Sequence, residues 1–410
     1  MDIKIMPGHL AGTVAAVPSK SQAHRLLICA ALADRRTELR IGAVSEDIEA
    51  TIRCLRALGA GIVASSNGFH IQPIAKPIAK GRVRLDCGES GSTLRFLLPL
   101  AAALCDEAHF FGHGHLGARP LAPLCAVLAS HGCRLEGNGL PLSISGSLQS
   151  GVYALPGNIS SQYISGLLFA LPLLAGNSEI RLLSPLESSP YVEMTIDCLA
   201  RFGIRVQKTA QGYSIPGGQH YSASSSLSVE GDWSNAAFWL AANALGGRVQ
   251  INGLPKHSLQ GDRAAWALCH EFAMHIQSGS PLHISINGAN IPDLVPILAV
   301  LGALTPGETC FYQVGRLRLK ESDRIQAVEA LLRALGAQVE SGADFLAIQG
   351  GALRGGLVDG CQDHRIVMAA AIAASACAEP LIIHGAEAVR KSYPHFFADY
   401  KRLGGNIHVL

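Results

Sequence analysis

The feature that most constrains the fold is a segment that recurs six times along the chain. In a clear copy, residues 331–339, an apolar helical stretch ends at Gly336 and an extended segment follows. Glycine is favoured just after a helix because φ is positive there. The copies recur at intervals of about 70 residues, which indicates a repeated supersecondary unit. The residues at the six helix ends are Gly59, Gly132, Gly203, Ala273, Gly336 and Gly404.

Each copy also contains a second, more apolar helical segment, which follows a strand and a turn. Good N-cap residues stand at or beside the expected starts of these segments, namely Ser19, Ser90, Ser160, Asp232, Asp293 and Asp363. Each unit is therefore predicted to be βαβαβ. A chain of 410 residues exceeds one typical core, so six units divide naturally into two α/β domains of three, with the boundary near residues 222–226. The expected helix starts lie near Lys20, Gly91, Ser160, Asp232, Asp293 and Asp363.

Composition excludes several classes of protein. Hydrophobic residues make up 49% of the chain, but every long apolar run has polar breaks, so no membrane span is expected. The N-terminus lacks the pattern of a signal peptide, and the 11 cysteines include no Cys-x-x-Cys pair. These features favour reduced thiols in a cytoplasmic protein over disulfides or a metal site. A net charge of +2 gives no general affinity for nucleic acid, so any anion site must be a local cluster.

One such cluster is the charged stretch at residues 316–324. It precedes residues 325–335, which have the pattern of an amphipathic helix ending at Gly336. Lys320 and Arg324 are four residues apart, so on a helix they would share a face. Two cations at a helix start, where the backbone already favours anions, predict a binding site for phosphate or carboxylate.

Polar residues also gather at the starts of the apolar helical segments. The first segment opens with Lys20, Ser21 and Arg25, which are costly on so apolar a helix. The second opens with residues 88–95, where two glycines let backbone N–H groups approach a ligand. If the units are alike, these ends point the same way in each domain. Two facing domains would then enclose an anion-binding cleft that needs no metal ion.

A set of motifs at these helix starts and elsewhere occurs in order along the whole chain. The motifs are Lys20-Ser21 with Arg25, Gly91-Ser92 with Arg95, Arg119-Pro120, Ser160-Ser161-Gln162, Pro190-Tyr191, Asp293, residues 320–324, Asp363-His364-Arg365 and residues 391–394. Together they resemble the 5-enolpyruvylshikimate-3-phosphate synthase family. The fold of that family has two inverse α/β domains of three repeats each, hinged around a central cleft. The resemblance implies an N-terminal domain of residues 20–225 and a C-terminal domain of residues 1–19 and 226–410.

The resemblance also implies an activity. Members of the family transfer the enolpyruvyl group from phosphoenolpyruvate to the 5-hydroxyl of shikimate 3-phosphate and release phosphate, in the pathway to chorismate and the aromatic amino acids. The reaction passes through a tetrahedral intermediate and uses no cofactor. It needs a base for the 5-hydroxyl, for which we expect Asp293. It also needs an acid for the enol methylene, for which we expect Glu321 together with Lys20.

The binding residues follow from the same resemblance. Both substrates are anions, so clustered cations would offset their charge and bring them together. We expect these two small molecules to be the binding partners of the protein, and we expect the protein to be a monomer. Shikimate 3-phosphate would be bound by Lys20, Ser21, Arg25, Ser160, Ser161, Gln162, Ser188, Tyr191, Asp293 and Lys320. Phosphoenolpyruvate would be bound by Lys20, Gly91, Arg119, Gln162, Arg324, Arg365 and Lys391.

Three alternatives remain open. The UDP-N-acetylglucosamine enolpyruvyl transferase family shares the fold and the donor. It has Asn after the lysine of the first helix, where this chain has Ser21, and a reactive Cys where this chain has Gly114. An RNA 3′-phosphate cyclase uses a related repeat but would need a basic surface for RNA, which a net charge of +2 does not favour. A non-catalytic anion-binding repeat protein would bind the same ligands without turnover.

Overall fold

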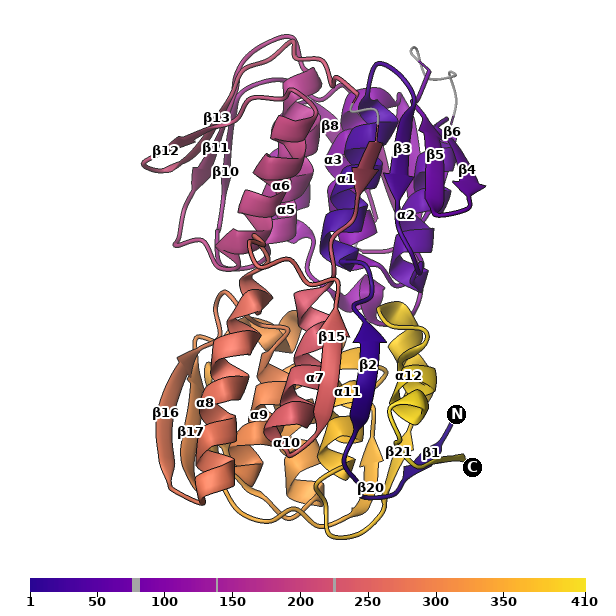
Figure 1. Cartoon of the computed structure of the whole chain (residues 1–410). Coiled ribbons are helices and arrows are strands. Elements are labelled where there is room, and N and C mark those ends of the chain that lie inside the picture. The colour runs from indigo at the N-terminus through magenta and orange to yellow at the C-terminus, as the bar shows by residue number, and fades with distance from the viewer. Residues whose placement is uncertain (76–81, 138, 224–225) are drawn as a thin grey trace. The chain divides into compact units, whose positions relative to one another are not determined.

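The computed structural model describes residues 1–75, 82–137, 139–223 and 226–410. The chain divides into two compact units: one is Pro18–Glu230, and the other combines Met1–Val17 with Gly231–Leu410 (Figure 1). The prediction of repeated α/β modules in two domains is confirmed. The domain boundaries expected after residues 19 and 225 stay a prediction, and residues 224–225 lie outside the described part of the chain.

The Pro18–Glu230 unit contains three modules with one order of helices and strands. The first has α1 (Lys20–Leu32), β3 (Thr37–Arg40), α2 (Glu46–Ala57), β4 (Gly61–Ser65) and β5 (Gly68–Gln72). The second has β6 (Arg82–Asp86), α3 (Gly91–Leu104), β7 (Glu107–Phe111), η1 (Gly114–Ala118), α4 (Ala122–Ala129), β8 (Cys133–Glu136) and β9 (Leu142–Gly146). The third has β10 (Val152–Leu155), α5 (Ser161–Ala170), η2 (Leu171–Leu173), β11 (Ser178–Leu182), α6 (Ser189–Arg201), β12 (Gln207–Thr209) and β13 (Gly212–Ile215).

The other unit also contains three modules. The fourth module has β2 (Ala11–Ala15), α7 (Trp233–Ala244), β15 (Arg248–Asn252), η3 (Gly261–Ala264) and α8 (Ala265–Ser278). The fifth has β16 (Leu282–Asn287), α9 (Val295–Leu304), β17 (Gly307–Tyr312), η4 (Gly315–Leu319), α10 (Arg324–Ala334), β18 (Gln338–Ser341) and β19 (Phe345–Gln349). The sixth has β20 (Gly356–Asp359), α11 (His364–Ala374), β21 (Leu381–His384), η5 (Ala386–Lys391), α12 (Phe396–Arg402), β22 (Ile407–Val409) and β1 (Ile3–Ile5).

Five of the modules form a four-stranded sheet with the same mixture of pairings. In the second module β6 pairs in parallel with β7, and the hairpin of β8 and β9 adds two antiparallel strands in the order β6-β7-β9-β8. The parallel pair needs a crossover, which α3 supplies. The predicted βαβαβ unit omitted the returning strand of this hairpin. That strand is needed because β9 lies between β7 and β8 and joins them.

One strand of each unit pairs with a strand that is far away in the sequence. β14 (Ser226–Ser228) precedes α7 in the chain, yet it pairs in parallel with β3 of the Pro18–Glu230 unit. β2 precedes α1 in the chain, yet it pairs in parallel with β15 of the other unit. Each strand takes the place that the strand before the first helix has in the other modules. The chain therefore passes from one unit to the other twice.

The fourth module departs from the prediction. The expected helix end at Ala273 is wrong, because α8 continues past it to Ser278 and is followed by Gly279, where φ is 67°. Alanine is a strong helix former, and Gly279 supplies the left-handed residue that ends the helix. The sheet of this module has only two strands among the described residues, β15 and β2. The other five predicted helix ends are confirmed, with positive φ at Gly59, Gly132, Gly203, Gly336 and Gly404.

The first helix of each module is buried along its sides. α7, α9 and α11 pack against one another, and α11 is buried over its whole length. In the other unit α3 and α5 approach so closely that a Cβ on Gly166 would overlap the carbonyl oxygen of Arg95. Helices with such apolar sides present polar groups mainly at their ends. Ser19, Ser90, Ser160, Asp232 and Asp363 cap five of these helices through their side chains, close to the predicted starts.

Two further findings concern the whole described chain. All 11 cysteines are free thiols. Across the described ranges, none of the helices combines the length and the apolar character that crossing a membrane requires.

Candidate active site

In the Pro18–Glu230 unit, Lys20 opens α1 and is paired with an acidic side chain. Its Nζ donates to Oδ2 of Asp47, 2.8 Å away in the first turn of α2. The two side chains are only 16% and 11% exposed, so the pair is weakly screened by solvent. Sequence reasoning missed Asp47, because an acid in the first turn of a helix is common without any such partner.

The glycine that opens α3 lies beneath two arginines. A Cβ on Gly91 would lie 2.5 Å from Nη1 of Arg119 and 2.7 Å from Nη1 of Arg95. Nη1 of Arg95 donates to Oε1 of Gln162 at 2.8 Å, and Nε2 of Gln162 donates to Oγ of Ser92 at 2.9 Å. Three predicted residues, Gly91, Arg119 and Gln162, are thus brought together at a helix start that favours anions. Arg95 was part of the quoted motif but was given no binding role.

Arg25 joins α1 to α6. Its side chain is buried, and it donates from Nε to Oγ1 of Thr195 at 2.8 Å, from Nη1 to the carbonyl of Ser21 at 2.6 Å and from Nη2 to the carbonyl of Tyr191 at 2.7 Å. Burial lowers the pKa of Arg25 to about 10, so the guanidinium stays charged at neutral pH. These bonds use three of the five N–H donors of a guanidinium. Arg25 therefore brings the predicted residues Ser21 and Tyr191 next to each other.

The predicted serines of this unit lie at two further helix starts. Ser160 caps α5 by accepting the N–H of Gln162 at 3.3 Å, and Ser161 is the first residue of that helix. Ser188 precedes α6 in the left-handed conformation, with φ of 54°, which is uncommon for a residue with a side chain. Backbone strain of this kind is concentrated at functional sites, and it supports a ligand role for Ser188.

In the other unit, Arg324 is the centre of a buried ion network. Its side chain is 1% exposed and donates to Asp293 at 2.6 Å, to Glu321 at 2.7 Å and to Asp363 at 2.7 Å. Burial alone would lower the pKa of Arg324, but Asp363, Glu321 and Asp293 raise it well above its usual value. The predicted residues Asp293, Glu321 and Arg324 are therefore in direct contact. Asp363 was expected only as a helix cap, and it also caps α11 by accepting the N–H of Arg365 at 2.9 Å.

Two more cations border Asp293. Nζ of Lys320 lies 4.0 Å from Oδ1 of Asp293, and Nη2 of Arg365 lies 3.6 Å from Oδ2. Burial would raise the pKa of Asp293, but Lys320, Arg365 and Arg324 hold it well below its usual range. Burial lowers the pKa of Lys320 to about 8, against the raising effect of Asp293. Nε and Nη1 of Arg365 are buried and have no hydrogen-bond partner among the described residues, which suits them to a substrate anion.

Lys391 belongs to the same cluster. It lies at the end of η5, is 9% exposed, and donates from Nζ to the carbonyl oxygen of Gln362 at 2.8 Å. Gln362 and its neighbour Cys361 both have φ of 51°, immediately before α11. Two consecutive left-handed residues other than glycine are strained. This strained turn brings Lys391 to the start of α11, where Asp363 and Arg365 also lie.

Two local expectations for this cluster are wrong. Lys320 and Arg324 do not share a helical face, because α10 begins at Arg324 and Lys320 is extended, with φ of −91° and ψ of −156°. Asp323 caps α10 by accepting the N–H of Gln326 at 3.1 Å, which fixes the start of the helix beyond Lys320. Asp293 is not a helix cap. α9 begins after Leu294 without a side-chain cap, and the carboxylate of Asp293 binds Arg324 instead.

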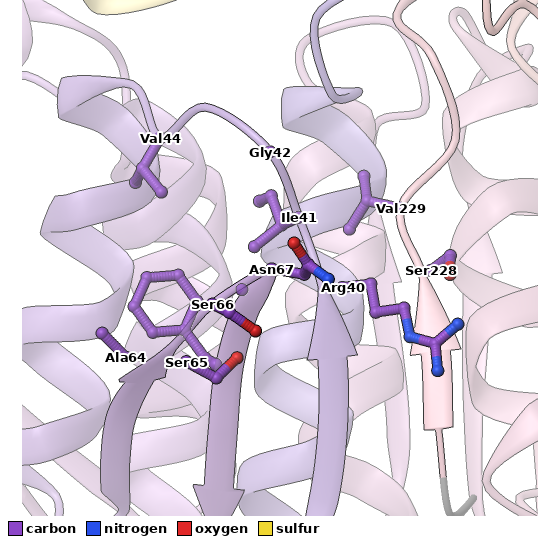
Figure 2. A pocket seen from close by; sticks show the side chains of 12 residues that line it. Arg40, Ile41, Gly42, Val44, Ala64, Ser65, Ser66, Asn67, Ser228 and Val229 are labelled. Carbon is purple, nitrogen blue, oxygen red and sulfur yellow. The ribbon is translucent and has the colours of Figure 1, made fainter.

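In the other unit the predicted residues Asp293, Glu321, Lys320, Arg324 and Arg365 lie in one cluster, whereas in the Pro18–Glu230 unit the predicted residues form smaller groups at the helix starts. The prediction that both groups face a cleft between the domains stays a prediction. A hollow of about 550 Å³ in the Pro18–Glu230 unit lies at the carboxyl ends of β3 and β14 and beside the turn between β4 and β5 (Figure 2). Arg40, Phe69 and Ser228 are among its lining residues. None of the predicted site residues lines this hollow in the described part of the chain.

Comparison with known proteins identifies the family. The family model described as EPSP synthase (3-phosphoshikimate 1-carboxyvinyltransferase) matches residues 5–400. The 3-phosphoshikimate 1-carboxyvinyltransferase of Clostridium kluyveri is 42% identical over 418 residues, and that of Clostridium acetobutylicum is 42% identical over 420 residues. Each match covers 99% of this chain and 98% of the relative. An EPSP synthase structure from Acinetobacter baumannii has a TM-score of 0.79 with 24% identity and 100% coverage of both chains, so it has the same fold. The chain belongs to the EPSP synthase family.

Proposed function

We propose that the protein transfers the enolpyruvyl group from phosphoenolpyruvate to the 5-hydroxyl of shikimate 3-phosphate and releases phosphate. Membership of the EPSP synthase family is the observation that carries the proposal. The buried cations at the helix starts of both units support it, because both substrates are anions. In this role the protein acts in the pathway to chorismate and the aromatic amino acids.

We assign the binding of shikimate 3-phosphate mainly to the Pro18–Glu230 unit. The starts of α1, α5 and α6 carry hydroxyl groups, and Arg25 holds α1 against α6. Hydroxyl and guanidinium donors are suited to a phosphate and to the hydroxyls of a sugar-like ring. The assigned residues are Lys20, Ser21, Arg25, Ser160, Ser161, Gln162, Ser188 and Tyr191, with Asp293 and Lys320 from the other unit.

We assign the binding of phosphoenolpyruvate to residues of both units. This substrate carries a phosphate and a carboxylate on the same carbon atom, so several cations are needed to offset its charge. The start of α3 offers Arg119 over Gly91, and the buried donors of Arg365 lie beside Asp293. The assigned residues are Lys20, Gly91, Arg119, Gln162, Arg324, Arg365 and Lys391.

The proposed reaction needs two proton transfers. Asp293 accepts the proton of the 5-hydroxyl of shikimate 3-phosphate while the oxygen of that hydroxyl bonds to C2 of phosphoenolpyruvate. Glu321, together with Lys20, donates a proton to the methylene carbon, which becomes a methyl group in the tetrahedral intermediate. The methyl group then returns a proton to the carboxylate of Glu321, the bond from C2 to the phosphate oxygen breaks, and the departing phosphate takes the proton that Asp293 had accepted. With a pKa of about 8, Lys320 is mainly protonated at neutral pH and acts as a cation beside Asp293.

The test is release of inorganic phosphate from phosphoenolpyruvate with each possible acceptor. We expect phosphate release with shikimate 3-phosphate and none with UDP-N-acetylglucosamine. Phosphate release with UDP-N-acetylglucosamine as acceptor, and none with shikimate 3-phosphate, would assign the protein to the UDP-N-acetylglucosamine enolpyruvyl transferase family. An Asp293→Asn variant should bind both substrates with greatly reduced turnover. If wild-type protein binds both substrates but releases no phosphate, the non-catalytic alternative is correct.

We further propose that the protein works as a monomer in the cytoplasm and needs neither a cofactor nor a metal ion. Light scattering after gel filtration, with and without both substrates, tests the monomer. Activity that survives dialysis against a chelator tests the absence of a metal requirement.

A further inference from the structure

Two side-chain contacts, one helical turn apart, join α1 to α2. Lys20 and His24 are four residues apart on α1, and Asp47 and Thr51 are four residues apart on α2, so each pair lies on one helical face. The outer contact is the ion pair of Lys20 with Asp47. The inner contact is a hydrogen bond of 2.7 Å between Nδ1 of His24 and Oγ1 of Thr51, and both side chains are fully buried.

The inner contact continues to the start of α3. Oγ1 of Thr51 lies 2.6 Å from Oγ1 of Thr93, and Oγ1 of Thr93 donates to Oγ of Ser90 at 2.8 Å. Ser90 is the N-cap of α3, and its Oγ also accepts the backbone N–H of Thr93 at 3.2 Å. A buried relay of four side chains therefore runs from α1, through α2, to the helix start that carries Gly91.

Counting the hydroxyl hydrogens determines which group donates and which accepts in each hydrogen bond of the relay. Each threonine hydroxyl has one hydrogen to donate. Thr93 directs its hydrogen to Ser90, with the carbonyl of Asp47 at 3.5 Å as a second acceptor, so it must accept from Thr51. Thr51 has then used its hydrogen and must accept from His24. His24 therefore carries its hydrogen on Nδ1.

The surroundings of His24 keep the ring neutral. Burial lowers its pKa well below the usual value, and the nearby cations Lys20 and Arg25 lower it further. Asp47, on the facing helix, is the acid of the outer contact and is already paired with Lys20. Nε2 of His24 is buried and has no hydrogen-bond partner within the described residues. A protonated ring would need a second partner on Nε2, which these residues do not offer.

We propose that His24, Thr51 and Thr93 are positioning residues, which hold the starts of α1 and α3 at a fixed separation and thereby place Lys20 relative to Gly91. The proposal rests on the function proposed above, because Lys20 and Gly91 are assigned there to the substrates. The relay is buried one helical turn below the ion pair of Lys20 with Asp47. It acts on the position of Lys20 through this ion pair. Small displacements matter at such a site, since a shift of about 1 Å in a reacting group can lower the rate about 100-fold.

The first test measures which ring nitrogen of His24 carries the hydrogen, and it does not depend on activity. Long-range ¹H–¹⁵N correlation spectra of protein labelled at histidine distinguish a hydrogen on Nδ1 from one on Nε2. The signal of His24 is assigned by its loss in the His24→Asn variant. We expect the Nδ1–H form, unchanged between about pH 8 and about pH 5.5. A hydrogen on Nε2, or titration in this range, would overturn the relay.

The second test compares two buried threonines. Thr51→Val keeps the shape of the side chain but removes the relay, so we expect kcat for phosphate release to fall by about 10- to 100-fold with a smaller change in KM. Thr51→Ser should restore most of the rate. Thr37→Val is the matched control, because Thr37 is equally buried and its hydroxyl has no hydrogen-bond partner among the described residues. Equal kcat for folded Thr51→Val and Thr37→Val would refute the proposal.

A second pair of variants decides the matter if Thr51→Val fails to fold. His24→Asn places an amide N–H near the position of Nδ1 and should keep most of the activity. His24→Gln places the amide near the position of Nε2 and should lose activity as Thr51→Val does. Equal activities for the two variants would refute the proposal. If wild-type protein releases no phosphate, the proposed function fails, whereas the spectra still test the relay.

Discussion

Replacing Gly91 with alanine tests whether the arginines over the start of α3 bind phosphoenolpyruvate. The new Cβ would lie 2.5 Å from Nη1 of Arg119 and 2.7 Å from Nη1 of Arg95. Ordinary contact begins at 3.4 Å, so the two guanidinium groups must move by about 0.9 Å and about 0.7 Å. Both groups are the ends of long side chains, so this movement requires little change in the backbone.

The expected result is a loss of affinity with little loss of stability. The free energy of unfolding of Gly91→Ala should change by less than about 1 kcal/mol, because only flexible side-chain ends are displaced. A shift of nearly 1 Å in a positioned group can cost about 100-fold, so KM for phosphoenolpyruvate should rise by about 10- to 100-fold. KM for shikimate 3-phosphate should stay within about twofold, because Gly91 is not among its assigned ligands.

Initial rates with each substrate varied in turn give both constants, and urea unfolding gives the stability. Gly351→Ala is the control, because a Cβ on Gly351 meets no atom within 4 Å and this glycine has no positive φ. The control should match the wild type in every constant. The reasoning fails if folded Gly91→Ala keeps its KM for phosphoenolpyruvate, or if KM for shikimate 3-phosphate rises instead.

Three variants of the other cluster give further predictions. Wild-type kcat/KM for shikimate 3-phosphate should fall as pH rises through about 8, because Lys320 then loses its charge, and Lys320→Arg should remove this decline from the pH–rate profile. Asp293→Asn should lower kcat by about 10²- to 10⁴-fold while calorimetry still detects both substrates, and an unchanged kcat would exclude it as the base. Asp363→Asn should lower the free energy of unfolding by about 3–5 kcal/mol in urea titrations, because Arg324 loses a buried partner, and an unchanged midpoint would contradict this.

Features set by local interactions could be predicted from the sequence. Ser19, Ser90 and Ser160 cap helices as expected, because capping depends on residues within one turn. Helices ending at Gly59 and Gly336 were equally predictable, since the left-handed conformation selects glycine. The repeat then indicated where polar residues gather.

Features set by contacts between distant segments could not be predicted. Nothing near Asp47 in the sequence indicates that it pairs with Lys20, and nothing near Asp363 indicates that it pairs with Arg324. The fourth module shows the limit of the repeat itself. Ala273 stood where the other copies have glycine, and the helix continues through it because no left-handed residue is needed there.

The carboxylates around Arg324 change what this cluster can do before a substrate binds. The sequence predicted Asp293 and Glu321 in the site but not their pairing, and these two carboxylates, with Asp363, already offset the charge of Arg324. While the cations face it, Asp293 has a low pKa and is a weak base. A substrate anion that draws Lys320 and Arg324 to itself would weaken this effect, so we expect the pKa of Asp293 to rise on binding. The anions that bind would thus prepare the base, which confines proton abstraction to the occupied site.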